Sequence, residues 1–145
     1  MIRRRLTLVL GLLLMAAPAS AQGTDDELGA VVVALVDRWQ SGDAGGVAEL
    51  GAGSGLDLEV HGQAVGQLTG RRAVAALRHL FGAQETVTVR GGQPSRVAGA
   101  DNRAFVELTW VIRPGGAQMV ERATVFVGFV REGPTWKVSQ IRILR

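Results

Sequence analysis

The last quarter of the chain, residues 120–144, most constrains the fold, because it contains two long runs of strand-forming residues. The first run, Glu121–Val130, alternates polar and apolar residues at its ends and is apolar throughout its middle, as is typical of a strand covered on both faces. The turn Arg131–Thr135 leads into the second run, Trp136–Ile143. An antiparallel pair is therefore predicted, with the first run as a central strand.

The apolar phase of the second run slips by one residue. Trp136 and Val138 share one face of a regular strand, whereas Ile141 and Ile143 fall on the other face. A β-bulge near Ser139–Gln140 would place all four side chains on one buried face and would curve the strand. The sequence therefore predicts a curved antiparallel sheet whose concave side is covered by other elements.

Helical patterns precede this sheet. Thr24–Glu27 has the spacing of a capping box, and an apolar stripe with helical period then continues to Trp39. A first helix is therefore predicted to begin at Thr24 and to end at Ser41–Gly42. Asp43 is predicted to cap a short second helix that ends near Leu50.

The middle of the chain predicts a third helix and further strands. Leu56–Val60 alternates as a strand with one polar face, and residues 61–66 are expected to turn the chain back. A helix over Arg71–Phe81 follows, with Thr69 at its cap position. The remaining predicted strands are Thr86–Arg90, Ser95–Gly99 and Arg103–Ile112.

The order of these elements predicts an α+β fold, in which three helices pack in the concave face of a bent antiparallel sheet. The predicted core consists of apolar side chains from both layers: Val32, Leu35, Val36, Trp39, Leu77, Phe81, Val106, Leu108, Trp110, Val127 and Phe129.

Residues 1–21 are interpreted as a secretory signal peptide. They have a basic start at Arg3–Arg5, an apolar run of about a dozen residues and a cleavage pattern, Ala19-Ser20-Ala21, before Gln22. The apolar run is shorter than the roughly 20 residues that span a membrane. We therefore expect export to the periplasm or the extracellular space, with residues 22–145 forming one domain that is not attached to a membrane.

Removal of the signal peptide changes the net charge. Three of the 16 basic residues lie in it and none of the 13 acidic residues does, so the remainder carries equal numbers of both signs. A formally neutral domain gives no electrostatic reason to expect a nucleic-acid partner. The chain has no Cys, so no disulfide or thiol chemistry is predicted.

Several motifs carry a family resemblance: Trp39 followed by Ser41-Gly42-Asp43 and Val47–Leu50, and the ending Val125–Phe129 with Trp136–Ile143. Together with the element order, they make the chain resemble the nuclear-transport-factor-2-like (NTF2-like, cystatin-like cone) superfamily. The resemblance covers nearly the whole chain after residue 21, and it is greatest to secreted bacterial members of unknown function. It implies a curved sheet wrapped around a long helix as a cone with an open mouth. That scaffold serves polyketide cyclases, ketosteroid isomerases, dehydratases and proteins without catalysis.

The resemblance also implies a homodimer, since members of the superfamily often pair through the outer face of the sheet. Phe105, Val111, Phe126 and Val130 lie in strands where they cannot all face inward. An exposed apolar surface of this kind favours association.

The sequence contains few candidates for catalytic residues. By resemblance, an isomerase of this fold uses a carboxylate base with a Tyr and a protonated acid, but this sequence has no Tyr. His61, near Asp57 and Glu59, is the candidate general base of a cyclase- or dehydratase-type enzyme. The alternative is that His61 is a solvated turn residue before Gly62. His79 lies opposite the apolar stripe of its helix and is predicted at the surface.

The same three residues are also possible metal ligands. Asp57, Glu59 and His61 alternate on one strand face, and carboxylates with an imidazole can bind zinc. A polar face on an edge strand is the simpler and preferred explanation, so no metal site and no cofactor is predicted.

Glu107 and Arg122 lie in the middle of strands among apolar neighbours, where a charge is costly unless it is paired. They are predicted either to form a cross-strand ion pair or to point into the cone as polar anchors for a ligand. In the second case Trp110, Arg122, Glu107 and His61 would line an entrance beside the Gly51–Gly55 loop. An apolar cavity with one Arg suits a hydrophobic carboxylate.

A filled cone is the opposing prediction, because Trp39, Trp110 and Phe81 are large enough to occupy its interior. The preferred function is a non-catalytic exported domain that binds a small apolar molecule or a protein partner. The alternative is an enzyme of the cyclase or dehydratase kind that uses His61 with Asp57 or Glu59.

Overall fold

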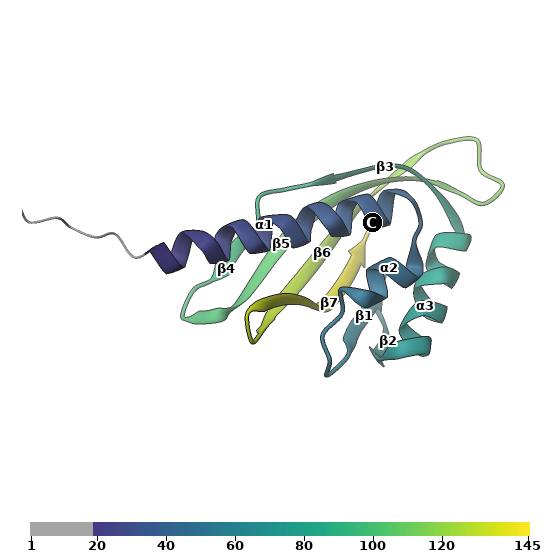
Figure 1. The fold of residues 1–145 in the computed structure, drawn as a ribbon. Helices are drawn as coiled ribbons and strands as arrows, with labels where there is room; N and C mark the ends of the chain where they lie inside the picture. Colours follow the sequence, from purple (N-terminus) through teal and green to yellow (C-terminus); the bar gives the residue numbers. More distant parts are fainter. Residues whose placement is uncertain (1–18) are drawn as a thin grey trace, which may run out of the picture.

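Residues 19–145 are described by the computed structural model, and they form a long helix, two shorter helices and a curved sheet (Figure 1). The predicted signal peptide covers residues 1–21, of which 1–18 lie outside the described residues. Its cleavage therefore stays a prediction.

The helices cover the inner face of the sheet, as predicted. They are α1 (Ala19–Gln40), α2 (Ala44–Glu49) and α3 (Gly70–Gly82). Figure 1 shows α1 lying along the sheet, with α2 and α3 near its C-terminal end. Leu35 and Trp39 of α1 and Leu77 of α3 are fully buried, because the apolar stripe of each helix faces the sheet. Thr69 occupies the N-cap position of α3, although its side chain makes no capping hydrogen bond.

The predicted start of α1 is wrong, because the residues before Thr24 continue the helix. Instead of capping, the Thr24 hydroxyl accepts a hydrogen bond from Arg96 Nη2 (2.6 Å), and its carbonyl accepts one from Trp136 Nε1 (3.2 Å). The predicted end is confirmed, since Gly42 has a φ of 68° just after the helix. Asp43 then caps α2 by accepting a hydrogen bond from the backbone N–H three residues later (2.9 Å).

The sheet is open and mixed. Its strands are β1 (Leu56–Val60), β2 (Gln63–Leu68), β3 (Gln84–Gly91), β4 (Ser95–Val97), β5 (Ala100–Pro114), β6 (Glu121–Glu132) and β7 (Thr135–Leu144). Their order is β2-β1-β7-β6-β5-β3, and β4 pairs with β5. All these pairs are antiparallel except β1 with β7, which is parallel. This one pairing differs from the predicted antiparallel sheet, because the chain between β1 and β7 crosses over through α3.

A strand replaces the turn that was predicted over residues 61–66. His61 and Gly62 alone form the turn, with φ values of 51° and 81°, and β2 begins at the next residue. Positive φ at both central residues is the geometry of a tight two-residue hairpin. Residues 63–65 are all exposed, so this strand has no apolar alternation that the sequence could have revealed.

The predicted bulge in β7 is confirmed. Gly128 pairs with Gln140 and Phe129 pairs with Val138, so Ser139 is the extra residue. As a result Trp136, Val138, Ile141 and Ile143, two on each side of the bulge, are all buried.

An aromatic cluster occupies the interior between α1, α3 and the sheet. The ring centroid of Trp39 lies 5.1 Å from that of Phe81 and 5.3 Å from that of Trp110. Phe81 and Trp110 also contact each other, and all three pairs are edge-to-face. The Trp110 indole donates a hydrogen bond to Thr86 Oγ1 (3.0 Å). Trp39 and Trp110 are completely buried, as the filled-cone prediction requires.

One edge of the sheet is closed by a side chain of α1. Gln40 Oε1 accepts a hydrogen bond from the N–H of Val89 (2.8 Å), and Gln40 Nε2 donates one to the carbonyl of Val87 (3.3 Å). The amide of Gln40 therefore binds two backbone groups of β3 that would otherwise be free to pair with another strand.

Candidate ligand-binding site

The predicted catalytic residues are split between two sides of β1. Leu56 and Leu58 are buried, so Asp57 lies on the outer face, where it is exposed. Glu59 forms an ion pair with Arg142 of the parallel strand β7 (3.2 Å). Among residues 19–145, no hydrogen bond or ion pair joins His61 to either carboxylate.

The predicted ligand-binding residues are not brought together either. Trp110 faces the interior, whereas Glu107 and Arg122 are exposed on the outer face. Glu107 pairs with Phe126 and Arg122 with Val111, so the predicted cross-strand pair is wrong. The two charges are tolerated mid-strand because their face of the sheet is open to solvent.

The loop that was predicted to border an entrance is held against the sheet. The N–H of Ala52 donates to the carbonyl of Val138 (2.8 Å), and the N–H of Val138 donates to the carbonyl of Leu50 (2.7 Å). The N–H of Gly53 donates to Glu132 Oε1 (2.9 Å). These bonds attach the Gly51–Gly55 loop to β7 and to the end of β6.

A pocket of about 360 Å³, which we call the α3 pocket, lies between α3 and the β1–β2 hairpin. Its lining is mainly apolar, with polar groups from the hairpin turn, α3, the start of β3 and the C-terminus: Leu58, Val60, His61, Val65, Ala76, His79, Leu80, Ala83, Gln84, Pro114 and Arg145. A concave, mostly apolar site with a few convergent polar groups is the usual form of a small-molecule site.

Arg145 is the fixed cation of the α3 pocket. Its Nη1 lies 3.2 Å from Glu121 Oε2 on β6, and its Nη2 donates to Gln84 Oε1 (3.4 Å). A guanidinium has five N–H donors, so these two contacts leave donors for a ligand. No periodic pattern in the sequence indicates this residue, because it lies just after β7.

Both histidines of the chain line the α3 pocket. Burial, followed by the positive charge of Arg145, lowers the pKa of His61 below its usual value of 6.5, and Glu121 partly opposes this shift. The neutral form of the His61 imidazole therefore predominates at pH 7. His79 is exposed, as predicted, and it also reaches the rim of the pocket.

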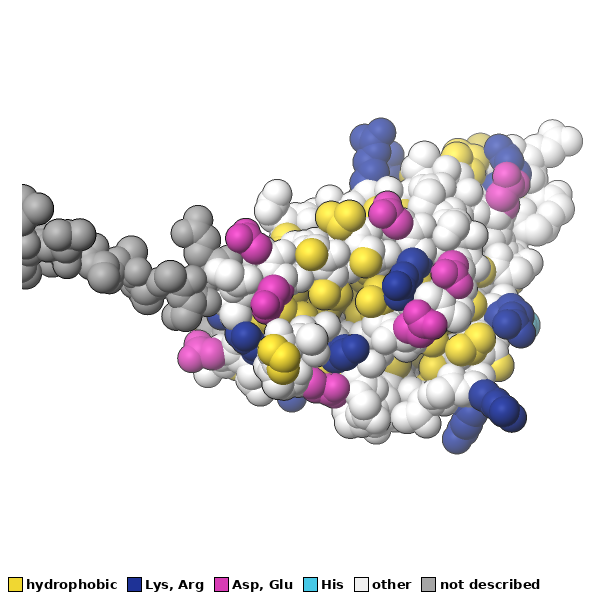
Figure 2. All heavy atoms as spheres, in the orientation of Figure 1, with side chains coloured by type: hydrophobic (Ala, Val, Ile, Leu, Met, Phe, Trp, Pro, Cys, Tyr) yellow, Lys and Arg dark blue, Asp and Glu magenta, His cyan; other side chains and the backbone are white. Residues whose placement is uncertain are grey.

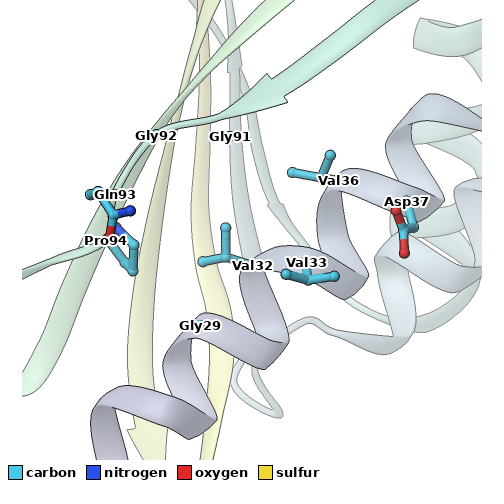
Figure 3. Close-up of a pocket in the computed structure, with 9 residues that line it drawn as sticks. All are labelled: Gly29, Val32, Val33, Val36, Asp37, Gly91, Gly92, Gln93 and Pro94. Carbon is cyan, nitrogen blue, oxygen red and sulfur yellow. The ribbon is translucent and has the colours of Figure 1, made fainter.

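A second hollow, of about 320 Å³, lies between α1 and the turn that follows β3 (Figure 3). Val32 and Val36 point from α1 toward Gly91, and a Cβ on Gly91 would come within 3.2 Å of Val36 Cγ2. Glycine therefore allows the strand to approach the helix closely. Val33, at the border of this hollow, is 61 % exposed, and Figure 2 shows hydrophobic side chains along this side of the molecule. Asp37 is its one charged lining residue, so it lacks the convergent polar groups of the α3 pocket.

Among residues 19–145, no group of three or more His, Asp or Glu side chains is arranged to hold a metal ion. No helix in this range has both the length and the apolar character needed to cross a membrane.

The helices and the curved open sheet define an NTF2-like fold, and solved structures that are similar to the chain have the same fold. The chain is similar to a DUF4783 family protein from Bacteroides ovatus (TM-score 0.64, 15 % identity, covering 77 % of this chain and 92 % of that one). It is also similar to a protein of ketosteroid isomerase-like fold from Catenulispora acidiphila, solved in complex with trimethylamine (TM-score 0.62, 16 % identity, 79 % and 84 % coverage).

A third similar structure is a putative dehydratase of the NTF2-like family from Streptomyces avermitilis (TM-score 0.57, 14 % identity, 85 % and 97 % coverage). In sequence, no family model and no curated protein matches the chain. At these identities the structural likeness establishes the fold alone.

Proposed function

We propose that this chain is an exported, non-catalytic NTF2-like domain that binds a small, mostly apolar molecule with one acidic group in the α3 pocket. The observation that carries the proposal is the convergence of Arg145, His61 and His79 on an apolar pocket of about 360 Å³. The volume is at the lower end of the range for small-ligand sites.

The chemistry of the lining selects the ligand class. Leu58, Val60 and Leu80 favour an apolar body, because burying it removes apolar surface from water. Arg145 is the charged lining residue, and a guanidinium binds a carboxylate through two parallel hydrogen bonds. A carboxylate ligand would compete with Glu121 for this guanidinium, so we expect modest affinity.

The trimethylamine complex of the Catenulispora acidiphila protein supports the general idea that this fold can hold a small organic molecule. The acidic group distinguishes our proposal, because the positive charge of Arg145 favours an anion and disfavours a cation.

A titration with three ligands that share one alkyl chain tests the head group. Octanoate, octanol and octylamine would be added to isotopically labelled protein, and backbone amide shifts would be followed by NMR. We expect saturable binding of octanoate with a Kd of about 0.1–1 mM, weaker binding of octanol and none of octylamine. Absence of saturation with octanoate and octanol would refute the pocket, and preference for octylamine would refute the acidic group.

Two variants locate the site. Ala76→Phe fills the pocket and should abolish binding, whereas Arg145→Gln should weaken octanoate about tenfold and leave octanol unchanged. Arg142→Gln is the matched control, because Arg142 is equally exposed (46 %) and makes one ion pair of the same length, 3.2 Å, outside the pocket. Equal losses in both Arg variants would show a general charge effect instead.

Catalysis by His61 is the second candidate function, and its position supports it: a neutral imidazole borders an apolar pocket, as a general base must. Glu121, rather than Asp57 or Glu59, is the carboxylate whose charge affects the pKa of His61, which it raises. A screen with dehydratase and cyclase substrates tests this candidate, with His61→Asn as the inactive variant. Turnover that persists in this variant would rule out His61.

Export is tested separately by the mass of the protein recovered from cells that secrete it. We expect a chain that begins at Gln22, and recovery of the intact chain from Met1 would contradict the proposed signal peptide.

A further inference from the structure

The outer face of the sheet has a polar pocket of about 350 Å³ that is separate from the α3 pocket. We call it the outer pocket. Its lining comes from three neighbouring strands: Thr88, Arg90, Thr109, Val111 and Arg122.

The strand register explains why these side chains meet. Val89, Trp110 and Ala123 are directly paired across β3, β5 and β6, and all three are buried on the inner face. Since side chains alternate along each strand, the residues before and after this row point outward. One outward row contains Thr88, Val111 and Arg122, and the next contains Arg90 opposite Thr109.

The two outward rows place Arg90 and Arg122 on either side of β5. Val111 and Thr109 of β5 lie between them as the floor of the outer pocket. Neither guanidinium has an ion pair among residues 19–145, and both side chains are exposed.

Nearby acids do not neutralise this pair. Glu85 is bound to Arg113 (3.0 Å) and Glu121 to Arg145 (3.2 Å), so both are already paired. Glu107 lies on the same face of β5, two residues from Thr109, and makes no ion pair within the described part of the chain. Two like charges that face one pocket without a counterion repel each other, and an anion between them would relieve that repulsion.

We propose that the outer pocket binds a tetrahedral oxyanion, such as phosphate or sulfate, either free or as a group on a larger molecule. Arg90 and Arg122 supply charge-assisted hydrogen bonds from two sides, because guanidinium geometry matches such oxygens. The Thr88 and Thr109 hydroxyls are additional donors from the floor and wall. This inference is independent of the function proposed for the α3 pocket.

Inorganic phosphate is the first probe, added to labelled protein at low ionic strength in a buffer without other oxyanions. We expect saturable shifts of the backbone amides of Thr88, Arg90 and Thr109, with a Kd of about 1 mM. Acetate, with one charge and two oxygens, should bind about fivefold more weakly. No saturation by phosphate at about ten times this concentration would overturn the proposal.

Variants distinguish specific binding of phosphate in the outer pocket from its non-specific attraction to positive charge. Arg90→Gln and Arg122→Gln should each weaken phosphate about tenfold. Arg103→Gln is the matched control, because Arg103 is exposed on the same face of β5 but pairs with Val130, far along the strand from the outer pocket. An equal loss in the control, or binding that survives in both pocket variants, would overturn the site.

Glu107→Gln tests the sign of the local field. Removal of this negative charge should strengthen phosphate binding by about twofold, and weaker binding would contradict a role for the two cations.

Phenyl phosphate distinguishes a free anion from a group on a larger ligand. If Val111 contacts a substituent, phenyl phosphate binds more tightly than inorganic phosphate, and Val111→Ser removes the difference. Equal affinity assigns the outer pocket to the free oxyanion. Exclusion of phenyl phosphate gives the same assignment.

Discussion

The two faces of the sheet differ in the burial of their side chains, although both faces are formed by the same strands. On β5 the inward residues Val106, Leu108 and Trp110 are completely buried, whereas the outward residue Phe105 is 45 % exposed. The inward set determines the fold, and the aromatic cluster fills its centre. The two binding sites that we propose, the α3 pocket and the outer pocket, lie outside that centre. The buried interior contributes to the stability of the fold.

Deletion of Ser139 is expected to have the largest effect, because the bulge keeps Trp136 and Val138 on the inner face. Without the extra residue, one half of β7 must turn its apolar side chains outward. We expect no cooperative thermal unfolding for the deletion variant by circular dichroism. Ser139→Ala keeps the bulge and removes only the hydrogen bond to the Gly128 carbonyl (3.2 Å), so it should cost about 1 kcal/mol. A folded deletion variant would show that the bulge is dispensable.

Trp39→Ala should have the next largest effect, because it opens a cavity between Phe81 and Trp110. We expect it to lower the free energy of unfolding by about 3–5 kcal/mol. Trp39→Phe should cost less, since it keeps an aromatic ring and removes an indole N–H that has no hydrogen-bond partner among the described residues. Val33→Ala, on the exposed side of the same helix, is the control and should change stability by less than about 0.5 kcal/mol. Denaturant unfolding measures all three.

The outer face should matter for association rather than for folding. Phe105 is exposed, and Phe126 and Val130 are partly exposed beside it, which confirms that these side chains face outward. We expect two copies to pair through them, so that light scattering at micromolar concentration gives a dimer and Phe105→Lys gives a monomer of similar stability. Val33→Lys changes an apolar residue of α1 and should leave the dimer intact. A monomeric wild-type chain would end this prediction.

The smallest expected effect is a pH dependence from His61. Its pKa in the folded state is below 6.5, so the unfolded chain binds the proton more readily as pH falls through the usual value. Stability should therefore decrease slightly between about pH 7 and pH 5 on account of this residue. His61→Asn should remove that part of the dependence. Identical melting temperatures against pH in both proteins would contradict the shift, and His79→Asn serves as the control.

Most of the fold was predictable, because burial leaves a periodic trace in the sequence. The phase slip in Trp136–Ile143 predicted the bulge at its correct place, and the stripe ending in Trp39 predicted the inner face of α1. Elements without such a trace were missed: β2 is mostly exposed, and its pairing depends on the turn at His61–Gly62. The start of α1 was misplaced because a capping pattern at Thr24 lies within a helix that continues upstream.

The sites were predicted less well, because each requires the strand register. Glu107 and Arg122 suggested a pair, yet the register sets them opposite Phe126 and Val111. His61 is an exposed residue of the turn after β1, as the alternative prediction had it, and it also borders the α3 pocket. Its neighbours there come from α3, β3, β5 and the C-terminus, and no local pattern predicts contacts across so many elements.

Gln40, at the end of α1, affects the tendency of the chain to aggregate. Its side-chain amide forms hydrogen bonds with the N–H of Val89 and the carbonyl of Val87. These two backbone groups of β3 are therefore not available to pair with another strand. Because Gln40 is the last residue of α1 and is exposed, movement of its side chain alone frees these two groups of β3, while the neighbouring Trp39 stays buried. A strand unmasked in this way can template intermolecular β-pairing. The rate at which the Gln40 side chain leaves β3, rather than the global stability, would then limit how fast such aggregates begin.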